Sequence, residues 1–408
     1  MSAIRASEIR YSTTAQYDGL LRLVCVDHLA TQECGRGLYR ALAKTRNVDL
    51  TLVVPPLWRE NFRDVPVEPL SPGSPFRLEI LSILFAGKSN RCIHLGLGRL
   101  LRHIRPDVVF LQSEPEDFLL SQVLVIRAIY GLKFKIIFIT WRNIHYPRFG
   151  IPYKFGWVYG FTEHFGLRYA DHCFSFSAAG QEMLRARGFH TIDVIPPAID
   201  TGFFKPTDGS AVRNTLRLQH FTIGYFGRFV NEKGVGLLLE AVAGLEYPIQ
   251  LLMVGNGPAR NTWMDLARQL KIENMVVHQP SVLRSAMPSY ICACDAVVLP
   301  SYATPQWKEQ FGRVLIEAMA CGVPVVGARS GEIPNVIGDA GLVFSEKNVP
   351  DLRGCLRKLI ENPPLKQRLS SLGRARAENN YSCHVVAGTW LRAIRNLLIS
   401  REGFKKAP

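Results

Sequence analysis

The sequence contains no long uncharged hydrophobic run. Its longest apolar candidate, residues 118–141, is interrupted by Arg127 and by two lysines, whereas a membrane-spanning helix needs about 20 consecutive apolar residues. The first twenty residues include Glu8 and Asp18 and have no apolar core of the kind that signal peptides carry. We therefore expect a chain that does not cross a membrane and works in the cytoplasm, with residues 1–20 as a polar leader.

Paired cysteines are also missing. The chain has nine cysteines, an odd number, and no Cys-x-x-Cys spacing occurs among them. Disulfide frameworks and structural zinc sites are built from such pairs. The sequence therefore suggests neither, and a reducing compartment is the expectation.

The composition is that of a folded protein with an excess of positive charge. Hydrophobic residues make up 47% of the 408 residues and charged residues 20%, which excludes a mainly disordered chain and leaves room for two or three domains. The net charge is +15, and the excess is concentrated in residues 353–408. A basic segment attracts phosphates, nucleic acid or anionic lipid, although a solvated helix face explains it equally well.

Buried strands alternate with helical patterns along the chain, which predicts parallel sheets of the α/β class. The prolines within residues 193–206 favour a domain boundary, so we expect an N-terminal Rossmann-like domain over 21–196 and a second one over 197–380. A helix and basic tail over 381–408 should pack back on the N-terminal domain. The predicted strands are 21–26, 48–54, 108–111, 136–140, 173–177, 222–226, 250–254, 275–278, 296–299 and 324–327.

Two doubly wound domains would leave a cleft between them. Ligands bind at the carboxyl ends of the strands in such sheets, so we expect the functional residues there. A carboxylate pair, Glu309 and Glu317, falls at this place: Glu309 follows a predicted strand, and Glu317 lies on the next helix, which should start near Phe311 or Gly312. Carboxylates accept hydrogen bonds and so suit the hydroxyl groups of sugars and ribose. Apolar neighbours make plain solvent exposure of Glu317 less plausible.

A second motif lies in the loop after the strand 222–226. Gly227 and Arg228 begin this loop and Lys233 ends it, so that two cations can converge on a diphosphate where glycine allows close approach of the backbone. Gly255 and Gly257 follow the next strand in the same way and add a third loop to this face.

Together these motifs resemble the retaining glycosyltransferases of family 4, the bacterial group 1 type with GT-B fold. The resemblance rests on the Gly-Arg-x4-Lys-Gly loop at 227–234, the Glu-x7-Glu pair at 309–317 and the run Glu-Ala-Met-Ala-Cys-Gly-Val-Pro at 317–324. It is specific over about residues 222–345. It implies that a nucleotide-diphospho-sugar, with UDP or GDP, binds the C-terminal domain and that an acceptor, a glycan or a lipid-linked molecule, binds the N-terminal domain.

The resemblance also implies roles for the residues that match the family's motifs. Arg228 and Lys233 would hold the diphosphate and stabilise the departing nucleotide. Glu317 would bind the ribose, and Glu309 would bind the donor sugar with help from the backbone amides of Phe311 and Gly312. No metal or cofactor is expected, because two cations take the place of Mg²⁺ and no Asp-x-Asp pair is present.

The N-terminal half departs from the family's pattern. Its first loop reads Gly35-Arg36-Gly37 where adjacent glycines are usual, so Arg36 is predicted to add a charge near the donor phosphate. Arg142 occupies the position of the family's usual acceptor-site histidine and cannot act as a base near neutral pH. His145 is the nearest replacement, unless it is structural, and Glu114 is a further acceptor-side candidate.

Eight aromatic residues fall within residues 146–165, interleaved with Arg148 and Lys154. Such a segment suits a membrane interface or a lipid-linked acceptor, and a core helix with a rigid loop explains it at least as well. We therefore expect peripheral contact with an anionic membrane as one of two readings. A liposome flotation assay distinguishes them.

Three hypotheses of function remain open at this stage. The first is retaining sugar transfer in the synthesis of a cell-surface polysaccharide or glycolipid. The second is a nucleotide-sugar epimerase of GT-B fold, and the third is a non-catalytic protein that binds a membrane or nucleic acid. The carboxylate pair and the two cations favour transfer. Nucleic acid is not expected as a partner, because the sequence carries no recognised motif or stacking platform for it.

Overall fold

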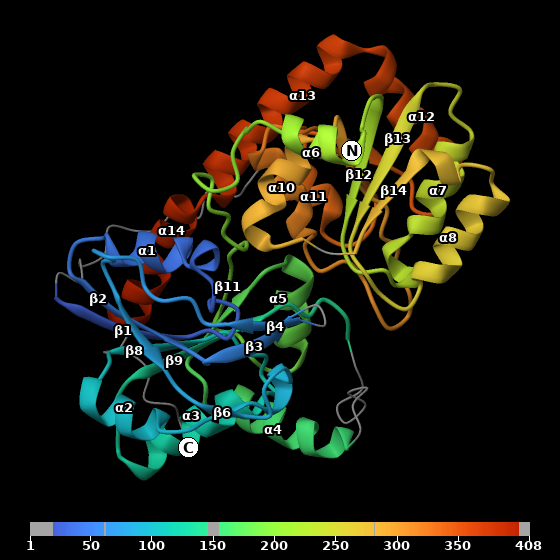
Figure 1. Cartoon of the computed structure of the whole chain (residues 1–408). Helices are drawn as coiled ribbons and strands as arrows, with labels where there is room; N and C mark the ends of the chain where they lie inside the picture. The colour runs from blue at the N-terminus through green and yellow to red at the C-terminus, as the bar shows by residue number, and fades with distance from the viewer. Residues whose placement is uncertain (1–18, 61–62, 146–154, 281, 400–408) are drawn as a thin grey trace.

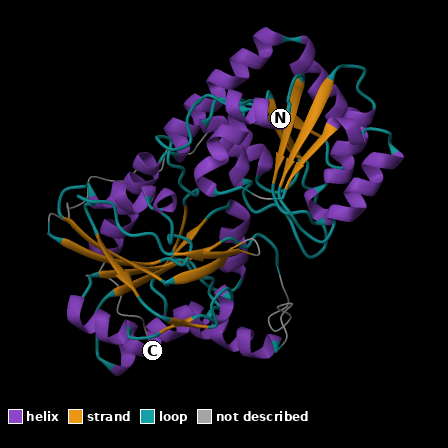
Figure 2. Ribbon diagram, viewed as in Figure 1, coloured by secondary structure: helices purple, strands orange, loops and turns teal. Residues whose placement is uncertain are grey.

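The computed structural model describes residues 19–60, 63–145, 155–280 and 282–399. It contains two domains, each built on a parallel sheet that is flanked by helices (Figures 1 and 2). This confirms the predicted architecture of two Rossmann-like domains. Parts of the predicted leader (1–18), of the aromatic segment (146–154) and of the basic tail (400–408) lie outside the described residues.

The N-terminal sheet has seven strands in the order β11-β10-β9-β8-β1-β2-β5, and all neighbouring strands are parallel. From β5 to β10 this is the Rossmann order 3-2-1-4-5-6, so the strand order reverses at β1. The strands are β1 (Leu21–Val26), β2 (Val48–Val54), β5 (Arg77–Ile80), β8 (Val108–Leu111), β9 (Lys135–Thr140), β10 (His172–Ser175) and β11 (Ile192–Val194). Two antiparallel hairpins lie beside the sheet: β3 (Leu57–Glu60) with β4 (Arg63–Pro66), and β6 (Ile83–Leu84) with β7 (Ile93–His94).

Separate hydrophobic cores form on the two faces of this sheet. Helix α1 (Gly37–Ala43) covers one face. The other face is covered by α2 (Leu97–Ile104), α3 (Phe118–Ile129), α4 (Gly156–Tyr169) and α5 (Ala178–Ala186). Because both faces are covered, the strands read as continuous apolar runs and not as alternating ones, which is why the sequence revealed them.

The C-terminal sheet has six parallel strands in the order β14-β13-β12-β15-β16-β17, again the Rossmann order. Its strands are β12 (Phe221–Phe226), β13 (Ile249–Val254), β14 (Val276–Gln279), β15 (Ala296–Leu299), β16 (Val325–Ala328) and β17 (Leu342–Phe344). Its helices are α6 (Ser210–Leu216), α7 (Val235–Ala243), α8 (Arg260–Gln269), α9 (Met287–Cys292), α10 (Arg313–Ala320), α11 (Ile333–Ile337), α12 (Val349–Glu361) and α13 (Pro363–Arg376). In the described part of the chain, no helix is both long and apolar enough to cross a membrane.

The ten predicted strands all exist, within two residues at each end. In the two large sheets the sequence missed β5, β11 and β17, which are short and at sheet edges, where the apolar signal is weak; it also missed the four strands of the two hairpins. The segment 193–206 begins with the end of β11, which continues to Val194 before the prolines begin.

The last helix, α14 (Cys383–Ile399), leaves the C-terminal domain and packs on the N-terminal sheet beside α1, where Figure 1 draws it in red. Apolar residues recur at helical spacing at Val386, Trp390 and Ile394, and all are buried. The Trp390 ring centroid lies 4.3 Å from that of Phe110 and 5.1 Å from that of Phe174. The predicted return of the C-terminal helix to the N-terminal domain is therefore confirmed.

The chain crosses between the domains twice, and the two crossings run together. Ile199 donates its amide to the carbonyl of Tyr381 at 2.8 Å, and the amide of Cys383 donates to the carbonyl of Ile199 at 3.0 Å. A short parallel bridge thus joins the outgoing and the returning segments at the base of the cleft.

Replacing Trp390 with Ala should destabilise the N-terminal domain, because the substitution opens a cavity between α14 and two buried phenylalanines. Removal of a buried tryptophan costs about 3–5 kcal/mol. Urea unfolding should show an earlier first transition for this variant and a much smaller change for Trp390→Phe. If both variants unfold like the wild type, α14 does not form part of this core.

His28 and His94 are buried in the N-terminal domain. Burial lowers the pKa of His94 to about 4, and burial together with the charge of His94 lowers the pKa of His28 to about 3. The His28 ring packs 4.1 Å from the Trp58 ring between centroids. Among the described residues, neither ring nitrogen of His94 has a hydrogen-bond partner, so protonation has nothing to offset its cost.

Replacing His94 with Leu should make the protein less sensitive to acid. As the pH falls from 6.5 to 4, the unfolded chain takes up a proton at this position and the folded chain does not, so the free energy of unfolding decreases. The decrease in the free energy of unfolding amounts to about 3 kcal/mol, because each unit of pKa shift corresponds to about 1.36 kcal/mol. His94→Leu removes this decrease.

Urea unfolding curves between pH 7 and 4 measure this difference. Asp117 acts in the opposite direction, because burial and then the charge of Glu114 raise its pKa to about 7, but it is present in both proteins and cancels from the comparison. The exposed His103 provides the control variant His103→Gln. Equal pH slopes for wild type and His94→Leu would contradict the prediction.

Candidate functional site

A cavity of about 410 Å³ lies at the carboxyl ends of the C-terminal strands and faces the N-terminal domain. It brings together eight residues that the sequence singled out from three separate loops: Gly227, Arg228, Lys233, Gly255, Glu309, Phe311, Gly312 and Glu317. The doubly wound topology explains this, because the loops after β12, β13 and β15 all leave the same edge of the sheet.

Glu309 is the most firmly held of these residues. It lies in the loop after β15 and is buried, with 6% of its surface exposed. Lys233 Nζ donates to Glu309 Oε2 at 2.7 Å, and Ser301 Oγ donates to the same oxygen at 2.7 Å. Lys233 also lies 5.0 Å above the Trp307 ring centroid. An ammonium group has three donors, so Lys233 can keep Glu309 and still donate to a bound anion.

The loop that carries Lys233 depends on Gly234. This residue adopts φ 69°, a left-handed conformation that glycine tolerates best, and a Cβ atom here would lie 2.1 Å from the carbonyl oxygen of Pro300. Earlier in the loop, the Tyr225 hydroxyl donates to the carbonyl of Arg228 at 2.7 Å. The backbone at both ends of the loop is therefore fixed, while the Arg228 side chain is exposed at the cavity wall.

Glycine is required at positions 255 and 257 for a structural reason that the sequence did not reveal. A Cβ atom on Gly255 would lie 1.9 Å from the carbonyl oxygen of Gly227, and one on Gly257 would lie 2.4 Å from that of Phe229. The two glycines let the loop after β13 pack on the loop after β12. Gly255 also lines the cavity, but Gly257 does not.

Glu317 lies in the second half of α10 with 8% of its surface exposed, as its apolar neighbours predicted. Arg284 Nη2 lies 3.4 Å from its Oε1. Gly312 precedes the helix with φ 85°, so that Phe311 and Gly312 bring the backbone of this turn to the cavity wall.

The N-terminal domain reaches the cavity through the segment after β9. Trp141 lines the cavity, and Asn143 Nδ2 donates to the backbone carbonyl of Glu309 at 2.9 Å. The sequence did not single out Asn143, Ser301 or Arg284, because no motif marks them. The departure from the family's pattern at residues 140–143 indicated a functional role for Arg142 and not for Asn143.

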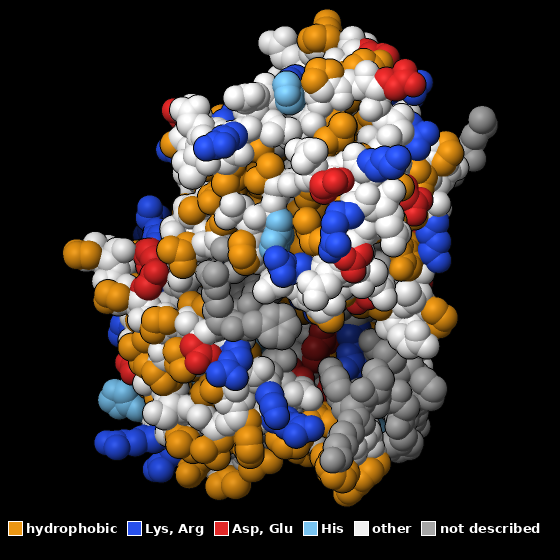
Figure 3. Space-filling view, turned by 45° about the vertical axis from the view of Figure 1, so that its right-hand side comes forward, with side chains coloured by type: hydrophobic (Ala, Val, Ile, Leu, Met, Phe, Trp, Pro, Cys, Tyr) orange, Lys and Arg blue, Asp and Glu red, His pale blue; other side chains and the backbone are white. Residues whose placement is uncertain are grey.

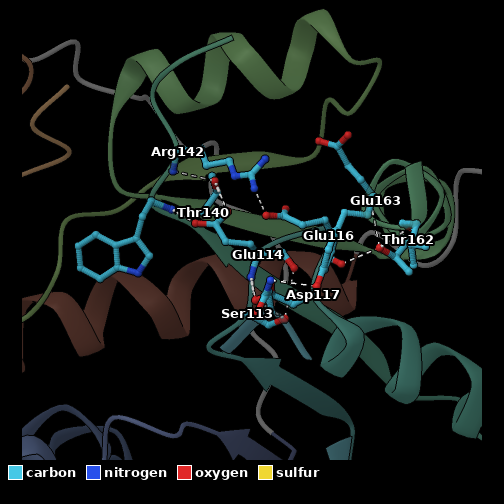
Figure 4. A network of polar contacts seen from close by, with 12 residues as sticks. Ser113, Glu114, Glu116, Asp117, Thr140, Arg142, Thr162 and Glu163 are labelled. Carbon is cyan, nitrogen blue, oxygen red and sulfur yellow. Dashed lines mark hydrogen bonds and ion pairs between the residues drawn. The ribbon is translucent and has the colours of Figure 1, made fainter. Parts of the chain in front are cut away.

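Arg142 is a structural residue. It is buried and forms an ion pair with the buried Glu116, and Figure 4 shows the two side chains pointing toward each other. Glu114 accepts from Thr140 Oγ1 at 2.7 Å and from the amide of Trp141 at 2.8 Å. These groups fix the segment that carries Asn143.

Glu114 and Arg142 lie in one network of polar contacts around residues 140–143 (Figure 4), but none of the three acceptor-side candidates lines a cavity between the domains. Neither Glu114, Arg142 nor His145 lines the cavity described above or the smaller cavity between the domains. Burial raises the pKa of Glu114, and His145 is exposed. The structure therefore gives none of them a direct position on a ligand.

The smaller cavity, of about 130 Å³, lies between the domains and is lined by Gly35 and Gly37 from the first loop. Arg284 and Arg313 line it from the C-terminal domain. The predicted glycines are thus at the cleft, but on the side opposite to the Lys233 loop.

The prediction that Arg36 adds charge near a phosphate was wrong. Arg36 is fully buried and donates to four backbone carbonyls, those of Ala30, Thr31, Glu68 and Pro69, at 2.7–3.1 Å. The guanidinium holds the first loop together, because five donors on one planar group can satisfy several carbonyls at once.

No group of three or more side chains suited to binding a metal ion gathers within residues 19–60, 63–145, 155–280 and 282–399. Lys233 pairs with Glu309 in the larger cavity, and Glu317 pairs with Arg284. The expectation of a metal-free reaction stays a prediction.

Comparison with known families supports the interpretation of the C-terminal domain. Residues 211–376 match the family described as glycosyl transferases group 1. A D-inositol 3-phosphate glycosyltransferase of Stackebrandtia nassauensis is 33% identical over 196 residues, which are 44% of this chain and 43% of that protein. One from Corynebacterium kroppenstedtii is 32% identical over 235 residues, 53% of this chain and 49% of that protein. The chain thus spans about half the length of these relatives.

Solved structures extend the similarity to both domains. Anabaena HepE, crystallised with UDP and glucose, aligns with a TM-score of 0.69 over 92% of this chain and 100% of that chain, at 18% identity. Sucrose-phosphate synthase from Thermosynechococcus elongatus aligns with a TM-score of 0.67 over 93% of this chain and 100% of that chain, also at 18% identity. These alignments establish the fold. The C-terminal domain is similar to the glycosyl transferases group 1 family over residues 211–376, and the whole chain is built on the GT-B fold.

Proposed function

We propose that this protein is a retaining glycosyltransferase that moves a sugar from a nucleotide-diphospho-sugar to a glycan or a lipid-linked acceptor. The observation that carries the proposal is the arrangement of Arg228, Lys233, Glu309 and Glu317 around one cavity at the carboxyl ends of β12 and β15. Two cations and two carboxylates in one cavity match the two halves of such a donor, the diphosphate and the hydroxyl-bearing rings.

Each charged group has a defined task in this proposal. Arg228 and Lys233 bind the diphosphate and stabilise the negative charge that develops as the nucleotide leaves. Glu317 accepts hydrogen bonds from the ribose hydroxyls. Glu309 accepts them from the sugar, next to the backbone of Phe311 and Gly312. The two cations supply the charge stabilisation that Mg²⁺ gives in other transferases, so that no metal is needed.

The chemical step balances without a protein base. The bond from the sugar C1 to the β-phosphate oxygen breaks, a bond from C1 to the acceptor oxygen forms on the same face, and the acceptor proton passes to the departing phosphate. This agrees with the place of Arg142, whose buried ion pair keeps it from proton transfer. UDP is the nucleotide we favour, since HepE was solved with UDP and with UDP-glucose.

The smaller cavity is the proposed acceptor site. Arg284 and Arg313 line it together with Asp27 and Asp200, so it suits a polar acceptor whose hydroxyl groups face the aspartates and whose negative group, where it has one, faces the arginines. The relatives named above act on a phosphorylated inositol according to their names, which is consistent with an anionic acceptor for this chain. NMR of the product tests retention, because an inverted anomeric centre would contradict it. Epimerised sugar without acceptor would favour the epimerase instead.

A thermal-shift panel of UDP-, GDP-, ADP- and TDP-sugars tests the donor site. A ligand that binds only the folded protein adds about 2.7 kcal/mol at a concentration 100 times its Kd. We expect one nucleotide to raise the Tm of the wild type, and Lys233→Ala and Arg228→Ala to abolish the shift.

Arg228→Ala is the safer of the two variants, because Arg228 is exposed and Lys233 is half of a buried pair. Lys271→Ala, at an exposed position beyond α8, is the matched control and should keep the full shift. Folded wild type that responds to none of the four nucleotides would contradict a donor site here.

Replacing Asn143 with Ala should slow turnover with little effect on nucleotide binding. The substitution removes the hydrogen bond that ties the N-terminal domain to the backbone of Glu309, and one such bond is worth about 1 kcal/mol, or about fivefold in rate. Release of UDP from the UDP-sugar measures turnover, and the thermal shift measures binding.

Asn335→Ala, a change to an exposed amide within the C-terminal domain, is the control for this variant. Unchanged turnover in Asn143→Ala, or an equal loss in both variants, would show that the contact between the domains has no part in the reaction. A loss of nucleotide binding in Asn143→Ala alone would contradict the prediction by showing that the contact supports the binding of nucleotide.

A further inference from the structure

Exposed hydrophobic side chains are concentrated on one part of the molecule. Of the fifteen large hydrophobic residues that are exposed in the described chain, ten fall between residues 84 and 169. Trp157 and Phe161 on α4 are 68% and 67% exposed, and Ile129 at the end of α3 is 71% exposed. Single exposed apolar residues are ordinary, but a cluster of aromatic ones needs an explanation.

Helices α2, α3 and α4 lie on the same side of the N-terminal sheet, where they share one hydrophobic core. Their outer sides therefore face away from the sheet in the same direction. We call this surface the aromatic–basic face. Its apolar members are Val125, Ile129, Tyr130, Phe155, Trp157, Phe161 and Tyr169, and its basic members are Arg99, Arg102, Arg105, Lys133 and Arg168.

The charge of this face is of one sign. Among the described residues from 84 to 169, no acidic side chain is exposed: Glu116, Asp117 and Glu163 are buried, and Asp107 and Glu114 are partly buried. Figure 3 shows the result at the lower end of the molecule, where orange and blue side chains adjoin with little red between them. The apolar and basic groups are thus not separated by counter-charges.

A basic cavity opens at the edge of the face. It has a volume of about 480 Å³ and lies where α2 and α3 end, lined by Arg22, Arg105, Tyr130 and Lys133. Asp107 pairs with Arg22 at 3.6 Å, so the remaining charge of the cavity is positive. Its size and charge suit a phosphate headgroup.

We propose that the aromatic–basic face docks on an anionic phospholipid membrane. Aromatic side chains insert at the level of the headgroups while arginines and lysines bind the negative surface. A protein partner would need acidic groups opposite the basic residues and an apolar patch opposite the aromatic ones. An anionic bilayer has negative headgroups and an apolar layer beneath them over its whole surface. This inference goes beyond the proposed sugar transfer, since it concerns a surface outside the catalytic cavity.

Flotation of the full-length protein with vesicles tests the proposal. Vesicles of phosphatidylcholine with about 30% phosphatidylglycerol should carry the wild type upward, vesicles of phosphatidylcholine alone should carry much less, and raised salt should weaken the binding. Trp157→Ser/Phe161→Ser should reduce binding about tenfold. Arg99→Gln/Arg105→Gln should reduce it about fivefold for each charge.

Matched controls lie on the C-terminal domain. Leu283→Ser changes a side chain that is 64% exposed, and Arg357→Gln/Lys358→Gln removes two exposed charges from α12; both should bind vesicles like the wild type. All changed side chains are exposed, so the variants should fold, which circular dichroism checks.

Three results would overturn the proposal: no binding of the wild type to anionic vesicles, an equal loss of binding in the control variants, or a wild-type dimer in sedimentation that Trp157→Ser/Phe161→Ser converts to monomer. The last would assign the face to a second copy of the chain. Nucleotide binding is measured separately by thermal shift, so failure here leaves the proposed transfer untouched.

Discussion

The buried ion pair between Lys233 and Glu309 is the contact on which the site depends. It joins the loop after β12 to the loop after β15 with two nearly buried side chains, and such a pair offsets its loss of hydration only when its geometry and its other hydrogen bonds are good. Ser301 supplies the second bond to the carboxylate, and Asn143 holds its backbone from the opposite domain. The position of the larger cavity is therefore set by both domains, although its charged groups come from one.

The fold could be predicted from sequence to a large extent, for a physical reason. Parallel strands covered on both faces must be apolar throughout. A strand such as 296–299 can therefore be recognised in the sequence without knowing which strands it pairs with. The gathering of residues around the larger cavity could be predicted too, because loops and helix starts at one edge of a sheet bring residues such as Arg228 and Glu317 together whatever the loop conformations. Neither inference needs the direction of any side chain.

The rest depended on where side chains point, which spacing does not encode. Arg36 and Arg142 stood in positions that suggested charges facing a ligand, yet each turns into the protein and is held there by carbonyls or by a buried carboxylate. Asn143 was missed because the carbonyl to which its side chain donates lies 166 positions away in the chain. Gly255 was predicted to let the backbone approach a ligand, whereas the structure shows that it lets its loop pack closely on the loop of Gly227.

The return of α14 to the N-terminal domain has a consequence for biosynthesis. The aromatic cluster of Phe110 and Phe174 is closed by Trp390, a residue that leaves the ribosome after nearly the whole chain. Domains generally complete their folding as they are made, the first before the second. In this chain the N-terminal core cannot be completed until α14 has been translated, so its apolar surface stays exposed while the C-terminal domain is made. The C-terminal domain therefore completes its folding before the N-terminal domain does.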